Sequence, residues 1–371
     1  MNNIKNINEI GSEFWFAPRD MMGNGDTLPT CLTDKFPVSN HLIMTSTGRN
    51  ACSLLLQHLQ PKKKSVLLPE YTGGSVIAPF VNAGYALHFY QVDHDLGLDM
   101  DQWRHQYQDT QPGVVLLHSY FGFDTLACLR EKYEAIQSDG SIVIEDVTHS
   151  LLSRFPLTCC PDYYLGSIRK WLGIPDGGFL LDCSESGRIS APDASDDVFV
   201  KTRVEAFLLK HSYMNDGNFG KKEQARLLLA KAEEHLDNTL TPFGISAVSR
   251  KILAKTDWNF IYHQRRGNYL FLEKELQKFS LLHPVFHSLP NDVCPLFMPI
   301  WVDENHRQKL KDHLVKNDVY TPIHWPLPKY VSENQTRLLN GIYGHGLSIP
   351  CDQRYNESHM LRIIDVLEKY F

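Results

Sequence analysis

The fold is decided by Ile142-Val-Ile-Glu-Asp-Val-Thr-His149 and Asp162-Tyr-Tyr-Leu-Gly-Ser-Ile-Arg-Lys-Trp-Leu-Gly-Ile-Pro-Asp-Gly-Gly-Phe179. Each stretch opens with a short run of apolar or aromatic residues, which is typical of a strand buried on both faces. The acidic residue Asp146 directly follows the first strand. The second is followed by Lys170 and then by a glycine-rich turn. A carboxylate and a lysine are therefore expected just beyond two buried strands.

The same alternation of apolar runs and helical patterns extends from about residue 42 to residue 182. Strands are expected at Ser65–Leu68, Leu87–Val92, Val114–His118, Ile142–Glu145, Tyr163–Leu165 and Gly178–Asp182. Helices are expected at Ala51–Leu59, Val76–Asn82 and Leu126–Ser138. This order predicts an α/β fold with a largely parallel, doubly wound sheet.

The pattern changes after about residue 184. Helices are expected at Lys222–Leu240, at Tyr262–Phe279 and near the C-terminus, and strands at Pro295–Val302 and Gly346–Pro350. We therefore expect a large domain at 1–244, including an N-terminal arm, and a smaller C-terminal α+β domain at 245–371.

Composition narrows the class of protein. The chain has 371 residues, 43% of them hydrophobic, and a formal charge of −6, so it can bury a large core and lacks the basic balance of a nucleic-acid-binding protein. No apolar run approaches the roughly 20 residues of a membrane span, and the polar start Met1–Ile10 does not resemble a secretory signal. Eight scattered cysteines, including the pair Cys159-Cys160, lack the spacing of a zinc site. We expect a cytoplasmic protein with reduced thiols and no metal.

Lys170 is the first candidate for chemistry. A lysine that attacks an aldehyde must be neutral, which requires a partly desolvated site near other cations. Arg169 meets the second condition, and the Ser167 hydroxyl could bind phosphate from the same turn. Ser-x-x-Lys also occurs in β-lactamases, but no Ser-Asp-Asn or Lys-Thr-Gly element follows it here.

Asp146 is the second candidate, because open α/β sheets bind ligands at the carboxyl ends of their strands. Pyridoxal 5′-phosphate (PLP) needs a lysine for a Schiff base and a carboxylate against its pyridine nitrogen. The alternative is that Asp146 only caps the next helix.

The third candidate is the loop Ser46-Thr-Gly-Arg-Asn50, which leads into an apolar helix. Backbone N–H groups and the helix dipole at such a helix start bind anions such as phosphate. A helix that is merely well capped would have a similar sequence.

The order of phosphate loop, strand-end acid and lysine resembles that of the DegT-type, sugar-aminotransferase-like group of fold-type-I PLP enzymes. The resemblance covers most of the chain. It rests on Pro69-Glu-Tyr-Thr72, Ala83-Gly-Tyr85, Val92-Asp93, His118-Ser-Tyr-Phe-Gly122, Glu145-Asp-x-x-His149, Lys170 with Gly177-Gly178, Tyr320-Thr-Pro-Ile-His-Trp325-Pro and Leu347-Ser-Ile-Pro350.

The resemblance implies a role for each matching residue. Lys170 would hold PLP and shuttle protons, Asp146 would pair with the pyridinium, and His149 would lie beside the phenolic oxygen. The expected cofactor contacts are Ser46, Thr47, Gly48, Arg49, Tyr71, Tyr120, Ser167 and Asn218. His324 and Trp325 would line the substrate cleft.

Three positions depart from the family pattern. Gly73 stands where an aromatic residue usually covers the ring, so Tyr71 or Tyr120 would have to cover it, or the face is open to substrate. Leu165 replaces a serine, for which Ser167 would compensate. The segment that reaches into the partner's site is replaced by Met214–Lys222, where Asn218 or a lysine would substitute.

The expected function is that of an aminotransferase in a homodimer. An amino acid, typically glutamate in this family, would donate an amino group to a keto group, plausibly of a nucleotide-linked sugar. The alternatives are another PLP reaction on the same fold, such as dehydration, decarboxylation or condensation, and a non-catalytic regulator.

Overall fold

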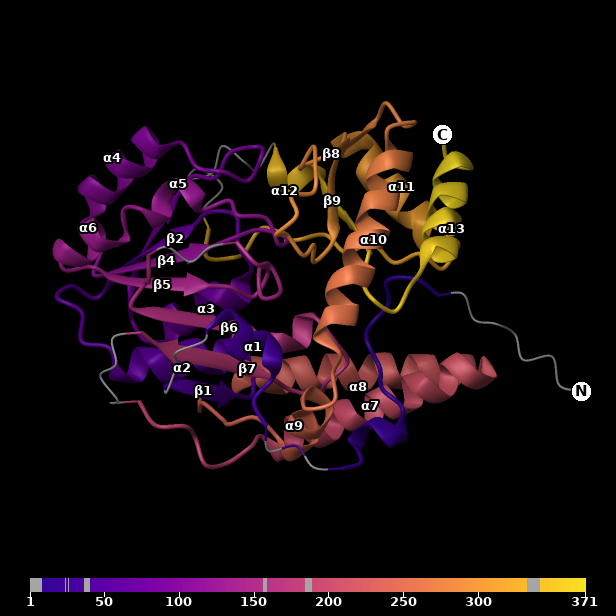
Figure 1. Ribbon diagram of the computed structural model, residues 1–371, viewed down its shortest axis with the longest axis horizontal. Coiled ribbons are helices and arrows are strands. Elements are labelled where there is room, and N and C mark those ends of the chain that lie inside the picture. The colour runs from indigo at the N-terminus through magenta and orange to yellow at the C-terminus, as the bar shows by residue number, and fades with distance from the viewer. Residues whose placement is uncertain are drawn as a thin grey trace, which may run out of the picture. The chain divides into compact units, whose positions relative to one another are not determined.

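The computed structural model describes residues 9–23, 25, 27–36, 41–155, 159–183, 189–331 and 341–371 (Figure 1). These residues form two compact units, each built from separate stretches of the chain. Unit 1 holds residues 13–59 and 165–257, and unit 2 holds residues 9–12, 60–164 and 258–371. Most of the polar start, Met1–Asn8, lies outside the described residues.

Seven strands form one mixed sheet in the order β1-β7-β6-β5-β4-β2-β3. They are β1 Leu42–Thr45, β2 Ser65–Pro69, β3 Ala86–Tyr90, β4 Val114–His118, β5 Ile142–Asp146, β6 Tyr163–Ser167 and β7 Gly178–Asp182. All six expected strands are confirmed, with small differences at their ends. The seventh strand, β1, has only four residues, too few to show a period.

Parallel pairing defines the strands of unit 2. β2 pairs with β3 and β4, and β4 pairs with β5. Every residue of β2 and β4 is buried, as expected for a parallel sheet covered on both faces. The register places His118 beside Asp146 at the carboxyl ends of β4 and β5.

Antiparallel pairing of β1 with β7 in unit 1 makes the sheet mixed. Thr45 lies opposite Gly178, and Leu42 lies opposite Leu181. The strand that precedes the Ser46–Asn50 loop is thus paired with the strand that follows the Lys170 turn.

The longest helices of unit 1 form a hairpin. α7 (Asp197–Asp216) ends at Gly217, whose φ of 71° is typical of a helix C-cap, and α8 (Phe219–Asn238) begins at the cap Asn218. The two helices lie side by side (Figure 1). α8 confirms the helix expected at Lys222–Leu240. α7 was not expected, because Arg203 and Lys210 interrupt its buried face.

The other helical segments of unit 1 are η1 Pro18–Met21, α1 Thr30–Lys35, α2 Gly48–His58, η2 Ile168–Lys170 and α9 Ala247–Leu253. Those of unit 2 are α3 Gly74–Asn82, α4 Met100–Thr110, α5 Ala127–Arg130, α6 Tyr133–Ser138, α10 Trp258–Leu276, α11 Glu304–Lys316, α12 Ile342–His345 and α13 Glu357–Glu368. No helix among the described residues is long and apolar enough to cross a membrane.

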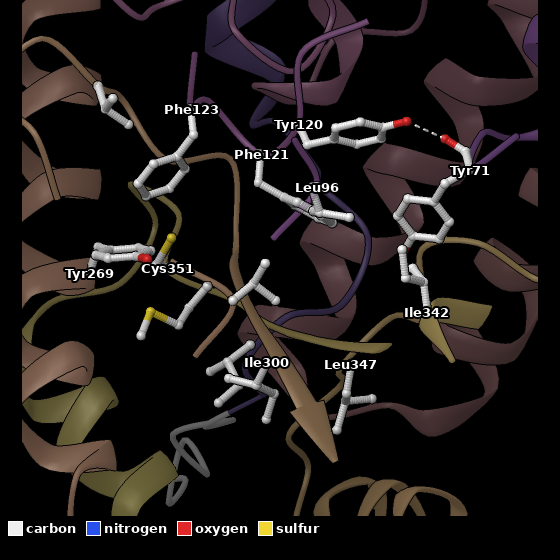
Figure 2. Packing of buried hydrophobic residues seen from close by; sticks show 14 of the residues in the cluster. Tyr71, Leu96, Tyr120, Phe121, Phe123, Tyr269, Ile300, Ile342, Leu347 and Cys351 are labelled. Carbon is white, nitrogen blue, oxygen red and sulfur yellow. Dashed lines mark hydrogen bonds between the residues drawn. The ribbon is translucent and has the colours of Figure 1, made fainter. Parts of the chain in front are cut away.

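The late part of the chain adds an antiparallel sheet to unit 2, in the order β10-β9-β8. Its strands are β8 Leu282–Pro284, β9 Met298–Val302 and β10 Gly346–Ile349. One hydrophobic cluster contains both Tyr71 and Tyr120 from the early part and Ile300 and Leu347 from this sheet (Figure 2). This shared core joins early and late parts of the chain within unit 2. The expected division into domains at 1–244 and 245–371 stays a prediction.

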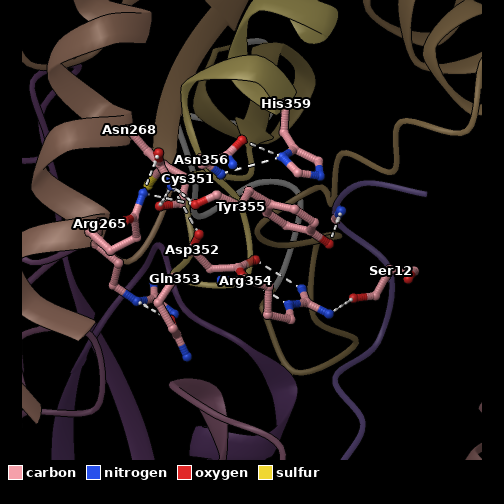
Figure 3. Close-up of polar contacts among 12 residues, drawn as sticks. Ser12, Arg265, Asn268, Cys351, Asp352, Gln353, Arg354, Tyr355, Asn356 and His359 are labelled. Carbon is pink, nitrogen blue, oxygen red and sulfur yellow. Dashed lines mark hydrogen bonds and ion pairs between the residues drawn. The ribbon is translucent and has the colours of Figure 1, made fainter. Parts of the chain in front are cut away.

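Polar contacts fix the chain after β10 against α10. Asn268 Nδ2 donates to the carbonyl oxygens of Asp352 and Tyr355, each at 3.0 Å (Figure 3). The buried Arg265 donates through Nε to Gln353 Oε1 at 2.8 Å. These bonds satisfy polar groups that the surrounding core would otherwise leave unpaired.

The helix expected at Leu126–Ser138 is wrong in one respect, since it is divided into α5 and α6. Both short helices contribute to a buried ion pair beneath β5. Arg130 Nη2 donates to Glu145 Oε1 at 3.0 Å, and the Tyr133 hydroxyl donates to Glu145 Oε2 at 2.9 Å. Glu145 is fully buried, whereas its neighbour Asp146 points to the opposite face of the strand, as successive strand residues do.

We expect Arg130→Ala to destabilise the protein by about 3–5 kcal/mol, because the Glu145 carboxylate would remain buried without its cation. Arg104→Ala is the matched control. Arg104 pairs with Asp101 at 2.9 Å, but both side chains are largely exposed, so its removal should change stability little. Urea unfolding measures both, and equal losses would contradict the burial argument.

Candidate active site

Lys170 lies at the end of η2, directly after β6. The turn is closed by the Gly177 carbonyl oxygen, which accepts hydrogen bonds from Ile168 N at 3.0 Å and Arg169 N at 3.3 Å. Trp171, the next residue, is fully buried and anchors the turn, while the Lys170 side chain is accessible to water.

Asp176 ties this turn to the start of α9. Its fully buried carboxylate accepts hydrogen bonds from Ser246 Oγ at 2.6 Å and Ser246 N at 2.8 Å, and from Ser249 Oγ. Gly177 follows with a φ of 146°, a conformation open to glycine and costly for other residues. The glycine-rich turn is therefore rigidly held.

The Ser46–Asn50 loop packs against the same turn. Gly177 N donates to the Ser46 carbonyl oxygen, and a Cβ on Gly178 would lie 2.2 Å from the Thr47 carbonyl carbon. A Cβ on Gly48 would lie 3.3 Å from Ser167 Cβ. The structure thus brings Ser46, Thr47, Gly48 and Ser167 together within unit 1, beside the turn that carries Lys170.

The start of α2 can accept an anion. Thr47 Oγ1 accepts a hydrogen bond from Asn50 N at 3.0 Å. The N–H groups of Gly48 and Arg49 lie in the first turn of the helix, where backbone N–H groups have no acceptor within the helix. Ser46 Oγ is buried and has no hydrogen-bond partner among the described residues. These features fit a phosphate group.

The surroundings of Lys170 favour its neutral form. Although the side chain is accessible to water, the protein around it excludes enough solvent to lower the pKa of Lys170, and the Arg169 guanidinium lowers it further. An amine with a lowered pKa becomes neutral at a lower pH, and a nucleophilic lysine has to be neutral.

The side chains of two residues expected to contact the cofactor, Arg49 and Asn218, have other partners in unit 1. Arg49 Nη1 pairs with Asp237 of α8 at 2.6 Å. Asn218 caps α8 at the exposed end of the hairpin, fifteen residues before Glu233, which pairs with Arg169. At 1.5 Å per residue this separation is roughly 22 Å, so Asn218 does not approach Lys170 of its own chain.

Asp146 and His118 lie together in unit 2. Asp146 is buried at the end of β5 and accepts a hydrogen bond from Thr148 N at 2.8 Å. His118, its register neighbour, is also buried; burial lowers the pKa of His118, although the Asp146 carboxylate acts in the opposite direction. His118 is therefore neutral over most of the physiological range.

His149 lies in an aromatic cluster in unit 2. Its ring is nearly parallel to the Trp325 indole, with centroids 5.2 Å apart, and lies 4.7 Å from the His118 ring. Phe121 N donates to His149 Nδ1 at 3.3 Å. His324 is next in the cluster, 6.1 Å from His149, and its Nδ1 lies 2.9 Å from Ser348 Oγ.

Tyr71 and Tyr120 are almost completely buried. The Tyr120 hydroxyl donates to the Tyr71 carbonyl oxygen at 2.6 Å (Figure 2). Trp325 packs against Tyr71 with centroids 5.2 Å apart and is only half-buried. A Cβ on Gly73 would lie 2.9 Å from Trp325 Nε1, so the indole occupies the space of a side chain at position 73.

The described residues contain no group of three or more His, Cys, Asp and Glu side chains arranged to hold a metal ion.

No family model matches the sequence, and no curated protein does. Solved structures resemble it along nearly its whole length. A DegT DnrJ EryC1 StrS aminotransferase from Brucella abortus is 16% identical with a TM-score of 0.63, over 96% of this chain and 91% of its own. Helicobacter pylori PseC, an aminotransferase involved in the biosynthesis of pseudoaminic acid, is 12% identical with a TM-score of 0.67, over 98% and 99%. The sugar aminotransferase CalS13 from Micromonospora echinospora is 13% identical with a TM-score of 0.63, over 97% and 99%.

The chain has the fold-type-I aminotransferase fold. The expected fold class, with a mostly parallel sheet flanked by helices and a smaller late α+β region, is confirmed.

Two residues of interest in this fold-type-I chain were not predicted from the sequence, His118 in unit 2 and Glu233 in unit 1. His118 ends a buried strand as Asp146 does, and that shared position is the signal that could have identified it. Glu233 had no such signal, because its partner Arg169 lies far away in the sequence.

We expect Gly73→Ala to destabilise the protein by about 1–3 kcal/mol, because the new Cβ would displace an indole that packs on His149 and Tyr71. The adjacent Gly74→Ala is the matched control, since its Cβ would meet nothing within 4 Å. Unfolding of both variants, and of Gly73→Ala combined with Trp325→Ala, tests the contact. A Gly73→Ala loss that persists unchanged without the indole would contradict it.

Proposed function

We propose that this protein is a PLP-dependent aminotransferase that transfers an amino group from an amino acid to a keto group of a sugar. The observation that carries the proposal is the setting of Lys170 in unit 1. A lysine with a lowered pKa stands on a rigid turn, and the same turn packs against a helix start suited to phosphate.

The residues of unit 1 fit the phosphate end of PLP. The unpartnered Ser46 hydroxyl, the first N–H groups of α2 and the Ser167 side chain would hold it, with Thr47 keeping the helix start in shape. Arg49 would act through its backbone, because its guanidinium pairs with Asp237.

The residues of unit 2 fit the ring end. We assign Asp146 to the ring nitrogen, because a buried carboxylate at a strand end can keep that nitrogen protonated. His149 would lie beside the phenolic oxygen. Among the aromatic side chains, Trp325 is better placed to cover the ring than the deeply buried Tyr71 and Tyr120, because it is half-buried and fills the space at Gly73.

Bound PLP supplies an electron sink for the negative charge that develops at the α-carbon of the substrate. The protein provides orientation and proton transfer. The neutral Lys170 amine would take a proton from the α-carbon of the substrate and then deliver it to C4′ of the cofactor. A lowered pKa favours the neutral amine that the first of these transfers requires. Burial keeps water from competing at the Asp146 carboxylate.

The acceptor side of the proposal rests on His324 and Trp325, which would line the substrate cleft. Support for a sugar comes from the fold comparisons, since CalS13 is described as a sugar aminotransferase. The S. venezuelae protein DesV, also similar in fold, was solved in complex with a ketimine intermediate. A homodimer, in which Asn218 would serve the partner's site, and a cytoplasmic location complete the proposal.

We expect the protein purified with PLP to absorb visible light, and borohydride to fix the cofactor on the peptide that contains Lys170. Lys170→Ala should lose this fixed label, while Lys201→Ala, an exposed lysine of α7, should keep it. Absorption spectra and peptide mass spectrometry measure both. Borohydride-fixed PLP in Lys170→Ala would refute the assignment.

We expect glutamate to convert the bound aldehyde to the amine form in a single turnover. Lys170→Arg should slow this conversion by about 10²–10⁴-fold, because the proton-transferring amine is lost. Stopped-flow absorption follows the change. If neither glutamate nor other amino donors alter the spectrum of the wild-type protein, transamination is excluded in favour of another PLP reaction.

A further inference from the structure

Two arginines share one glutamate beside Lys170. Arg169, the residue before Lys170 in η2, donates to both carboxylate oxygens of Glu233, at 2.8 and 3.3 Å. Arg203 of α7 donates to Glu233 Oε1 at 3.1 Å. Three separate elements of unit 1, η2, α7 and α8, therefore meet at one carboxylate.

Aromatic packing holds this cluster in place. The guanidinium groups of Arg169 and Arg203 each lie 5.5 Å from the centre of the Phe199 ring, and Arg203 also lies 5.0 Å from the Phe207 ring. Phe199 belongs to a buried group with Ala232, the neighbour of Glu233, and Leu236. Cation–π contacts of this kind are stronger when the cation is desolvated, and both guanidinium groups are largely buried.

The charges of this cluster act on Lys170 in opposite directions. The Arg169 and Arg203 guanidinium groups favour the neutral form of Lys170, whereas the Glu233 and Glu13 carboxylates favour its charged form. Although burial acts in the opposite direction, the two arginines lower the pKa of Glu233 to about 2, so it stays ionised. Burial and then Arg169 lower the pKa of Arg203 to about 10, so it stays charged near neutral pH.

We propose that Arg203 and Glu233 are positioning residues for Lys170: they hold Arg169 on the turn and set the net charge that the lysine amine meets. The proposal rests on the function proposed above, in which that amine is the nucleophile. Neither helix residue need touch a substrate. Glu233 acts through Arg169, and Arg203 offsets part of the negative charge of Glu233.

Opposite changes follow from the two partners. Removing Arg203 leaves the Arg169–Glu233 pair intact but removes a positive charge, so Lys170 should hold its proton to a higher pH. Removing the Glu233 charge takes away the carboxylate that the two guanidinium groups share, so Lys170 should lose its proton at a lower pH. A purely structural role for the cluster would not give opposite signs.

The test is the pH dependence of Lys170 acetylation in the full-length chain without bound PLP, followed by mass spectrometry of its peptide. Arg203→Met should move the midpoint up by roughly one pH unit and Glu233→Gln should move it down by roughly one pH unit. Arg203→Lys, which keeps the charge, should stay near the wild-type midpoint. Glu223→Gln, on an exposed pair with Arg226 of the same helix, is the control and should change nothing.

Shifts of the same sign in Arg203→Met and Glu233→Gln, or no shift in Arg203→Met, would overturn the proposal. If Glu233→Gln does not fold, the comparison of Arg203→Met with Arg203→Lys still decides it, because both keep the Arg169–Glu233 pair. PLP uptake by the wild-type protein is measured separately. A chain that takes up no PLP would refute the proposed function. The labelling result would still show whether Arg203 and Glu233 act on Lys170.

Discussion

The backbone of Gly178 lies so close to Thr47 and Gly48 that no side chain fits between them. This contact joins the loop before α2 to the turn after η2, and the pairing of Thr45 with Gly178 continues it into the sheet. Asp176 and Ser246 then secure the turn from the other side. The position of Lys170 relative to the start of α2 follows from these constraints, because both are attached to the same short piece of backbone.

In unit 2 the polar residues of β5 are divided between two environments. The Glu145 carboxylate is neutralised by Arg130 and hydrogen-bonded by Tyr133, so it stabilises the layer of helices that covers the sheet. Asp146, one residue later, is the last residue of β5 and lies beside His118 of β4. Strand alternation alone thus separates a structural carboxylate from one that is available for chemistry.

The sequence predicted what depends on local pattern. Short apolar runs indicate buried strands, and the residues at the ends of these strands, such as Asp146, can then be located in the sequence. Contacts between distant segments leave no such trace. The space at Gly73 is filled by Trp325, and the charge of Arg169 is met by Glu233; each pair is widely separated in the chain. α7 was not predicted for a related reason. Cations such as Arg203 can lie on its buried face only because Glu233 and aromatic rings surround them.

The interleaving of the two units also bears on how the chain folds during synthesis. β1 pairs with β7, as Leu42 does with Leu181. Residues 60–164 are synthesised between the two strands, so β1 cannot pair until β7 has left the ribosome. Contacts so distant in sequence form slowly because a long loop must close first. Until then α2 lacks the contact with β7 and leaves apolar surface exposed, which favours aggregation of the early chain.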